Sequence, residues 1–161
     1  MSSDWSALYS SHAPDIASFL LKLTGDPEEA SDLMQETFVR AMRSNTDARD
    51  LRSARAWLFR IAANLAHDHH RRKALLRFVP FSGREEGASG LSDPEAEVVR
   101  RALRAVPIAQ ATTLLLHYDV GFQRKEIAQL EGISEEAVKS RLARGRDAFA
   151  RAFERLGGRI T

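Results

Sequence analysis

Residues 122–146 read FQRKEIAQLEGISEEAVKSRLARGR, and this stretch decides the fold of the C-terminal part of the chain. A short helix is predicted to end at Gly132, because glycine suits the tight turn that follows a helix. Ser134 can cap a second helix, whose first turn holds Glu135 and Glu136 at the positive end of the helix dipole. The stretch therefore predicts two helices joined by a tight turn.

The second of these helices combines an apolar face with a cationic surface. Its inner face is formed by Val138, Leu142, Phe149 and Phe153. Its outward cations are Lys139, Arg141, Arg144 and Arg146. Two helices with a glycine-containing turn and a cationic second helix indicate a helix-turn-helix, whose second helix enters the major groove of DNA. An ordinary helical hairpin with a charged surface is the alternative.

A second basic segment, residues 55–72, reads RAWLFRIAANLAHDHHRR and also has helical periodicity. Its apolar face consists of Leu58, Ile61, Ala62 and Leu65. On another face, a polar stripe at spacings i, i+4, i+7 and i+11 is formed by Arg60, Asn64, His67 and Arg71. Cations with an amide suit contacts to a nucleic-acid backbone and some reading of base edges. Trp57 is interpreted as a core anchor rather than a base-stacking residue.

The run His67-Asp68-His69-His70 raises the question of a metal site. Only His67 and His70 have the spacing that places two ligands on one helix face. A catalytic metal needs at least a third ligand from elsewhere, and the sequence places none. We therefore predict no metal site at this run; no cofactor and no catalytic residue are expected in the chain either.

Charge is segregated along the 161 residues, although the net charge is only +2. The first 48 residues carry 3 basic and 8 acidic side chains, whereas residues 49–77 carry 8 basic and 2 acidic ones. Residues 137–161 carry 7 basic and 2 acidic side chains. Two basic segments suggest two contacts with a polyanion, and solvated helix faces are the alternative.

Composition excludes several classes of protein. The chain contains no cysteine, which excludes a disulfide scaffold and a cysteine-ligated zinc site. No apolar run approaches the roughly 18–20 residues that cross a bilayer, and the first residues lack a signal pattern. A cytoplasmic protein without membrane insertion is therefore expected.

The predicted organisation is all-α, with two small helical domains and a flexible linker. Residues 80–94, PFSGREEGASGLSDP, are rich in Pro, Gly and Ser and show no hydrophobic period. They separate domains at 1–78 and 95–161, with the linker at 79–94. The other predicted helices span about 4–23, 27–42, 54–72, 95–105 and from 107 onward, and Asp26 is expected to cap the second of these.

Three stretches together resemble a known family. GDPEEASDLMQETFVRAMR (residues 25–43) and the segment 55–72 resemble the σ2 domain of extracytoplasmic-function (ECF) sigma factors. Residues 106–146, VPIAQATTLLLHYDVGFQRKEIAQLEGISEEAVKSRLARGR, resemble their σ4 domain. The resemblance covers nearly the whole chain in the family's order. It implies a σ2-like helical bundle, a σ4-like helix-turn-helix domain, and a sigma factor that directs promoter-specific transcription initiation by RNA polymerase.

The resemblance also implies roles for particular residues. Docking on the β′ clamp helices of core RNA polymerase would use Asp32, Gln35, Glu36 and Phe38, with core packing as the alternative for Phe38. Minus-ten DNA would be contacted by Arg60, Asn64, His67 and Arg71, and the loop at 44–53 would capture a flipped base. The minus-thirty-five element would be read by Lys139, Ser140, Arg141 and Arg144.

The implied partners are core polymerase (β′ and β), promoter DNA and an anti-sigma factor, with no enzymatic activity. Two hypotheses from other classes compete with this interpretation. A stand-alone helix-turn-helix regulator would bind DNA without polymerase, normally as a dimer. A metal-dependent hydrolase would use the histidine run.

Overall fold

The computed structural model describes residues 2–44, 53–76 and 93–159, and every element within these ranges is helical. The elements are α1 (Ser2–Thr24), α2 (Pro27–Arg43), α3 (Ala54–Leu76), α4 (Pro94–Ala105), α5 (Ile108–Leu114), the π-helical segment η2 (Leu115–Val120), α6 (Arg124–Glu131) and α7 (Glu135–Arg155). The predicted all-α class is confirmed. Most of the predicted linker and most of the base-capturing loop lie outside the described residues.

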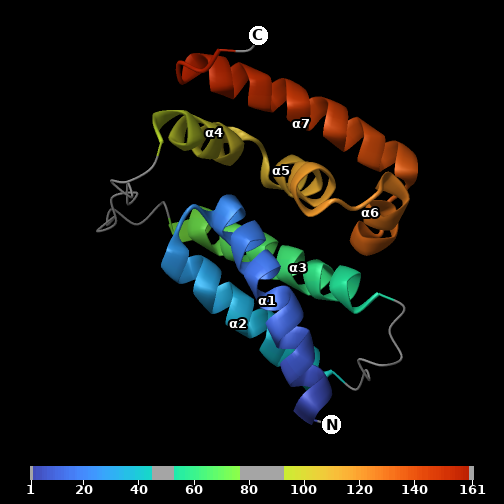
Figure 1. Cartoon of the computed structure of the whole chain (residues 1–161). Helices are drawn as coiled ribbons and strands as arrows, with labels where there is room; N and C mark the ends of the chain where they lie inside the picture. Colours follow the sequence, from blue (N-terminus) through green and yellow to red (C-terminus); the bar gives the residue numbers. More distant parts are fainter. Residues whose placement is uncertain (1, 45–52, 77–92, 160–161) are drawn as a thin grey trace.

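Helices α1, α2 and α3 pack on one another as a bundle, here called the N-terminal unit (Figure 1). As predicted, Asp26 begins α2, since its side chain accepts hydrogen bonds from the backbone N–H groups of Glu28 and Glu29. Phe19 of α1 and Phe59 of α3 meet edge to face, with ring centroids 5.3 Å apart. Both rings are fully buried, so they anchor the bundle core.

Helices α4 to α7 form the C-terminal unit, in which α7 packs on α4, α5 and α6. The predicted turn is present: Gly132 adopts a φ of +68° after α6. The Ser134 hydroxyl accepts a hydrogen bond from Ala137 N at 3.0 Å and caps α7. At the other end of α6, the Glu126 carboxylate accepts a hydrogen bond from Gln123 N. Local capping therefore fixes both helices of the helix-turn-helix.

The helix predicted from residue 107 onward is an α-helix only as far as Leu114. Residues Leu115–Val120 form a π-helix that ends at Gly121, whose φ is +98°. The N–H groups of Gly121 and Phe122 both donate to Leu116 O. Hydrophobic periodicity does not predict this wide turn. Asp119, Val120 and Phe122, at its end, contact the N-terminal unit.

The two units lie against each other, with α5 and α6 between α3 and α7 (Figure 1). Helix α3 packs on α5 and α6, and α1 packs on α4, α5 and η2. The buried side chains of both units form one continuous apolar cluster. Helix α3 is therefore enclosed by neighbours on two sides, whereas α7 lies at the outer edge of the molecule.

Candidate nucleic-acid and polymerase interfaces

The polar stripe predicted on α3 lies mostly on the surface. Arg60, Asn64 and Arg71 are exposed. Arg71 forms an ion pair with Asp68, which precedes it by three residues on the same helix. The opposite face of α3 is buried and contributes Leu58, Phe59, Ala62, Ala63, Leu65 and Ala66 to the core. Solvent therefore reaches two cations and an amide along about 16 Å of helix.

His67, the fourth member of that stripe, is half-buried against the C-terminal unit. Its Nε2 lies 2.8 Å from Thr112 Oγ1 on α5. Because the Thr112 hydroxyl donates its single hydrogen to Ile108 O, the His67 Nε2–H is the donor to Thr112. Burial lowers the pKa of His67, and the charges of Arg141 and Arg71 lower it further. His67 is thus neutral at neutral pH and faces another helix.

The neighbouring histidines of the run point to different partners. His69 Nε2 lies 3.2 Å from Glu29 Oε2 on α2, on the side of α3 away from Thr112. Lys73 also pairs with Glu29, at 3.1 Å. Within residues 2–44, 53–76 and 93–159, no three His, Asp or Glu side chains gather in a way that could hold a metal ion. The histidine run is divided between contacts to two other helices.

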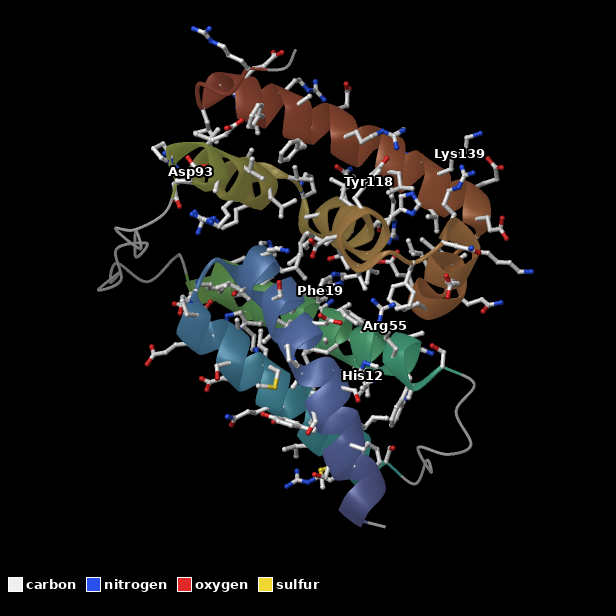
Figure 2. The ribbon with its side chains drawn as sticks, in the orientation of Figure 1. His12, Phe19, Arg55, Asp93, Tyr118 and Lys139 are labelled. Atoms are coloured by element: carbon white, nitrogen blue, oxygen red, sulfur yellow. The ribbon has the colours of Figure 1, made fainter. Side chains whose placement is uncertain are left out.

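The four residues predicted on α7 occupy different positions around the helix. Lys139 is exposed and lies on the outer surface of α7, away from the N-terminal unit (Figure 2). Arg144 is also exposed, and its Nη2 donates to Ser140 Oγ at 2.8 Å. Arg141 turns the other way, and its Nη1 lies 3.7 Å from Glu131 Oε2. Successive residues are about 100° apart on a helix, so Lys139 and Arg141 lie on opposite flanks.

The predicted polymerase face of α2 is mostly open, with one exception. Asp32 and Gln35 are exposed, and Glu36 is partly exposed and pairs with Arg40. Phe38, in contrast, is only 4% exposed, and its ring packs edge to face on Tyr9 at a centroid distance of 4.8 Å. The alternative of core packing therefore applies to Phe38.

Two exposed apolar side chains extend the α2 face and were missed from the sequence. Val39 and Met42 are 37% and 57% exposed and follow Asp32 at i+7 and i+10. They therefore share one side of the helix with Asp32, Gln35 and Glu36. The DLMQETF motif ends at Phe38, so attention to the motif alone overlooked them.

The contacts between the units form a seam that the sequence did not predict. Its members from the N-terminal unit are Lys22, Arg55, Phe59 and His67, and those from the C-terminal unit are Thr112, Asp119, Val120 and Phe122. Arg55 Nη2 donates to Val120 O at 2.8 Å, and its guanidinium lies 4.7 Å from the centre of the Phe122 ring. Phe122 also packs edge to face on Phe59, 5.6 Å away, and Lys22 pairs with Asp119 at 2.8 Å.

Comparison with known proteins matches each of the two units to a different region of one protein family. Residues 8–75 match the family described as Sigma-70 region 2, and residues 96–149 match Sigma-70, region 4. The ECF RNA polymerase sigma factor SigL of Mycobacterium tuberculosis is 37% identical over 161 residues, covering 94% of this chain and 89% of SigL. EcfG of Rhodopseudomonas palustris is 30% identical and covers 85% and 78% of the two chains. The chain belongs to the ECF sigma factors.

Two solved structures share the fold of this sigma factor. One is RpoE from Bartonella quintana in complex with the anti-sigma factor NepR, with a TM-score of 0.75, 20% identity and coverage of 94% of this chain and 97% of RpoE. The other is CnrH in complex with the cytosolic domain of CnrY, with a TM-score of 0.71, 24% identity and coverage of 96% and 90%. The likeness extends over both helical units.

As a member of this family, the protein is a sigma factor for RNA polymerase that directs promoter-specific transcription initiation. Across the described part of the chain, no helix has the length and apolar character needed to span a membrane.

Trp57, which the sequence predicts to be a core anchor, is partly buried and packs near Trp5, with ring centroids 6.3 Å apart.

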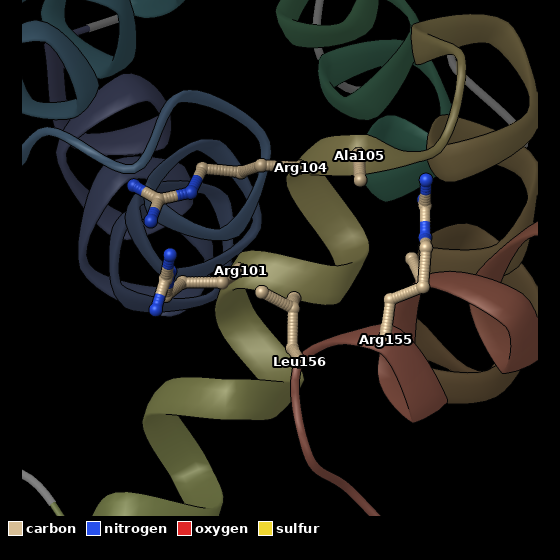
Figure 3. Close-up of a pocket in the computed structure, with 6 residues that line it drawn as sticks. Arg101, Arg104, Ala105, Arg155 and Leu156 are labelled. Atoms are coloured by element: carbon tan, nitrogen blue, oxygen red, sulfur yellow. The ribbon is translucent and has the colours of Figure 1, made fainter.

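A pocket of about 430 Å³ lies between α4 and the C-terminal end of α7 in this sigma factor (Figure 3). Its lining includes Arg101, Arg104 and Arg155. The Arg104 side chain lies directly over Gly25. Gly25 has a φ of +73°, so the turn between α1 and α2 favours glycine at this position. The pocket contains none of the predicted site residues.

Proposed function

We propose that three helices of this sigma factor have separate functions. Helix α2 docks on polymerase, α3 contacts the minus-ten element and α7 contacts the minus-thirty-five element. The observation that carries the proposal is the separation of charge onto distinct exposed faces: an acidic face on α2, and cationic faces on α3 and α7. Acidic side chains suit a protein partner, whereas cations suit the DNA backbone. The domains are proposed to span 1–78 and 95–161, as the sequence predicts.

Docking on the β′ clamp helices is assigned to Asp32, Gln35 and Glu36 on α2. The exposed Val39 and Met42 on the same side add apolar area to the polar contacts. Phe38 supports this face from beneath, because its ring holds α2 against Tyr9 of α1. An apolar patch with a polar rim is the usual composition of a protein–protein contact.

Minus-ten contacts are assigned to Arg60, Asn64, His67 and Arg71. The two arginines suit phosphates, and the Asn64 amide can bond base edges or the backbone. His67 joins this surface only when it leaves Thr112. Capture of a flipped base by the loop at 44–53 remains a proposal, since residues 45–52 lie outside the described ranges.

Minus-thirty-five contacts are assigned to Lys139, Ser140, Arg141 and Arg144 at the N-terminal half of α7. This half follows the turn of the helix-turn-helix, which is the part that enters the major groove. Glu135 and Glu136 are exposed at the tip, where a carboxylate accepts a hydrogen bond from cytosine N4. An acidic tip would therefore select among sequences.

The two units must separate for both DNA elements to be bound together. Elements about 25 base pairs apart lie about 85 Å apart at about 3.4 Å per base pair. A compact chain of 161 residues is only about 40 Å across. Promoter binding by this sigma factor therefore requires the seam to open, and an open seam frees His67.

The remaining assignments follow from family membership. The protein acts through binding alone, with no enzymatic activity of its own, and works in the cytoplasm beside RNA polymerase. RpoE was solved with the anti-sigma factor NepR and CnrH with the cytosolic domain of CnrY, and the first of these complexes supports an anti-sigma factor as a partner of this chain as well.

Run-off transcription with core polymerase and genomic promoter fragments tests the proposal. Addition of the purified protein should produce new start sites that core polymerase alone does not give. A double variant with Asp32→Ala and Gln35→Ala should lose these start sites together with binding to core polymerase. If the double variant binds core polymerase normally, the assignment of α2 is wrong.

A further inference from the structure

Glu131 is a buried carboxylate in the turn of the helix-turn-helix, and none of the roles assigned so far uses it. Its side chain is 7% exposed, and it is the last residue of α6. Burial raises the pKa of Glu131, although Thr113 and Arg141 act in the opposite direction. The negative end of the α6 dipole also disfavours a charge there. A carboxylate in this position needs partners that favour its ionised form.

Glu131 has two such partners, and both belong to the C-terminal unit. Thr113 Oγ1 lies 3.0 Å from Glu131 Oε2, and Arg141 Nη1 lies 3.7 Å from the same oxygen. Thr113 is fully buried on α5, and its single hydroxyl hydrogen is shared between Glu131 Oε2 and Ala109 O, each 3.0 Å away. Arg141 approaches from α7 and is one-third exposed. The order of groups, from the core to the surface, is Thr113, Glu131, Arg141.

Arg141 keeps most of its hydrogen-bonding capacity in this arrangement. Among the described residues, the closest polar contact of the Arg141 guanidinium is its 3.7 Å ion pair with Glu131, so its N–H groups remain available. A free arginine side chain loses up to about 2 kcal/mol of rotamer entropy when it is immobilised on a target. The Glu131 carboxylate, 3.7 Å away, attracts the guanidinium to one position, which reduces this loss and leaves the N–H groups for a phosphate or a base.

We propose that Glu131 is a positioning residue for minus-thirty-five recognition, which holds the Arg141 guanidinium ready for DNA. The inference rests on the proposed contact between Arg141 and the minus-thirty-five element. Positioning of Arg141 is distinct from a contribution to stability, because an apolar side chain could fill the same buried site without burying a charge. It also differs from competition with DNA, in which Glu131 would weaken Arg141 binding.

The test uses holoenzyme assembled with core polymerase and a promoter fragment found by run-off transcription. The measured quantity is the upstream preference, defined as the ratio of dissociation constants for the fragment with a scrambled minus-thirty-five element and for the intact fragment. Arg141→Ala should lower this ratio about tenfold. Glu131→Leu should lower it about threefold to tenfold, and the double variant should fall no further than Arg141→Ala.

Two controls separate positioning from folding. Thermal unfolding of Glu131→Leu should be unchanged or should occur at a higher temperature, so preference and stability move independently. Glu154→Gln removes an exposed charge at the far end of α7 and should leave the preference unchanged.

A pH series gives a further test. The upstream preference of the unmodified protein should fall as the pH is lowered toward the raised pKa of Glu131, whereas that of Glu131→Gln should not. Arg141 and Thr113 face Glu131, and His67 faces Arg141, so His67→Gln should keep the pH dependence.

Three results would overturn the inference. A higher preference in Glu131→Leu would make Glu131 a competitor of DNA. An unchanged preference in Glu131→Leu, with a clear loss in Arg141→Ala, would leave Glu131 without a role in recognition. An unchanged preference in Arg141→Ala, with normal transcription, would remove the assigned DNA contact of Arg141 and with it the role of Glu131, while sigma activity itself would stand.

Discussion

Helices α3 and α7 carry similar chemistry in very different surroundings. Both present cations proposed to contact DNA, yet α3 packs on α1 and α2 on one side and on α5 and α6 on the other. Helix α7 packs mainly on α4, α5 and α6 of its own unit, and Lys139 on its outer surface is exposed. The seam therefore engages a predicted DNA contact on α3, His67, whereas Lys139 on α7 is already accessible. Minus-ten contacts should depend on opening of the seam more than minus-thirty-five contacts do.

The largest expected effect comes from removing the aromatic centre of the seam. Phe122 is 3% exposed and packs on Phe59 and Arg55, so Phe122→Ala should lower the free energy of unfolding by about 3–5 kcal/mol. Chemical denaturation measures the loss. Separation of the units can be followed by energy transfer between dyes on cysteines introduced at the exposed Ser31 and Ala143, because the chain has no cysteine of its own. Unchanged energy transfer would show that Phe122 does not hold the units together.

Next in size is the effect on strand opening of truncating the exposed stripe of α3. Arg60→Ala combined with Asn64→Ala should reduce open-complex formation about a hundredfold, at about 1–3 kcal/mol per contact. Binding to core polymerase should persist, because both side chains are exposed and take no part in the apolar packing of the bundle. Arg72→Ala removes an exposed charge that is off the stripe and serves as the control. Equal loss of polymerase binding and opening would assign the stripe to fold support.

A smaller effect is expected from the open surface of α7. Lys139→Ala should weaken the upstream footprint about fivefold to tenfold and reduce the salt dependence of binding by about one counterion. Arg151→Ala, farther along α7 and paired with Asp147, is the matched control. An unchanged footprint for Lys139→Ala would assign this flank to solvent.

Closure of the seam should depend on pH through His67. Its pKa lies below the ordinary 6.5 in the closed structure, because burial and then Arg141, Arg71 and His70 disfavour the charge, against a smaller opposite effect of Asp68. The closed form therefore binds a proton less readily than the open form, so its stability is complete above pH 6.5 and declines as pH falls below that value. Energy transfer between the two labelled units should fall over this range. In His67→Gln this part of the pH dependence should vanish, and a full response in that variant would assign it to another group.

The smallest effect belongs to the ion pair between Lys22 and Asp119. Their side chains are 36% and 37% exposed, so the pair should contribute no more than about 1 kcal/mol. A double-mutant cycle with Lys22→Ala and Asp119→Ala, read by energy transfer at low and high salt, measures it. A coupling well above this size would make the pair a principal contact of the seam.

Local features of the fold were predictable because their partners lie within a few residues. The Asp26 cap, the Ser134 cap and the Gly132 turn each depend on hydrogen bonds that span no more than five residues. The polar stripe of α3 follows from helical spacing in the same way. The π-helical segment was not predictable, since hydrophobic spacing does not distinguish its wide turn from a turn of α-helix.

The candidate site was predictable as a set of residues but only partly as a surface. Spacing placed Arg60 and Asn64 on one exposed face of α3, and the motif pointed to Asp32 on α2. The burial of Phe38 and the engagement of His67 depend on Tyr9 and Thr112, which lie 29 and 45 residues away in sequence. Periodicity gives the face of a helix but not the neighbour that covers it.

The sequence by itself determined the all-α class, the caps of α2 and α7, the charge segregation and the family to which the chain belongs. These properties come from short-range hydrogen bonds, hydrophobic spacing and motifs. Only the tertiary structure decided that the units close on each other, that Arg55 bonds a backbone carbonyl 65 residues away, and that Glu131 lies behind Arg141. Such contacts form between segments that sequence spacing does not relate, so they depend on how the packed helices meet in space.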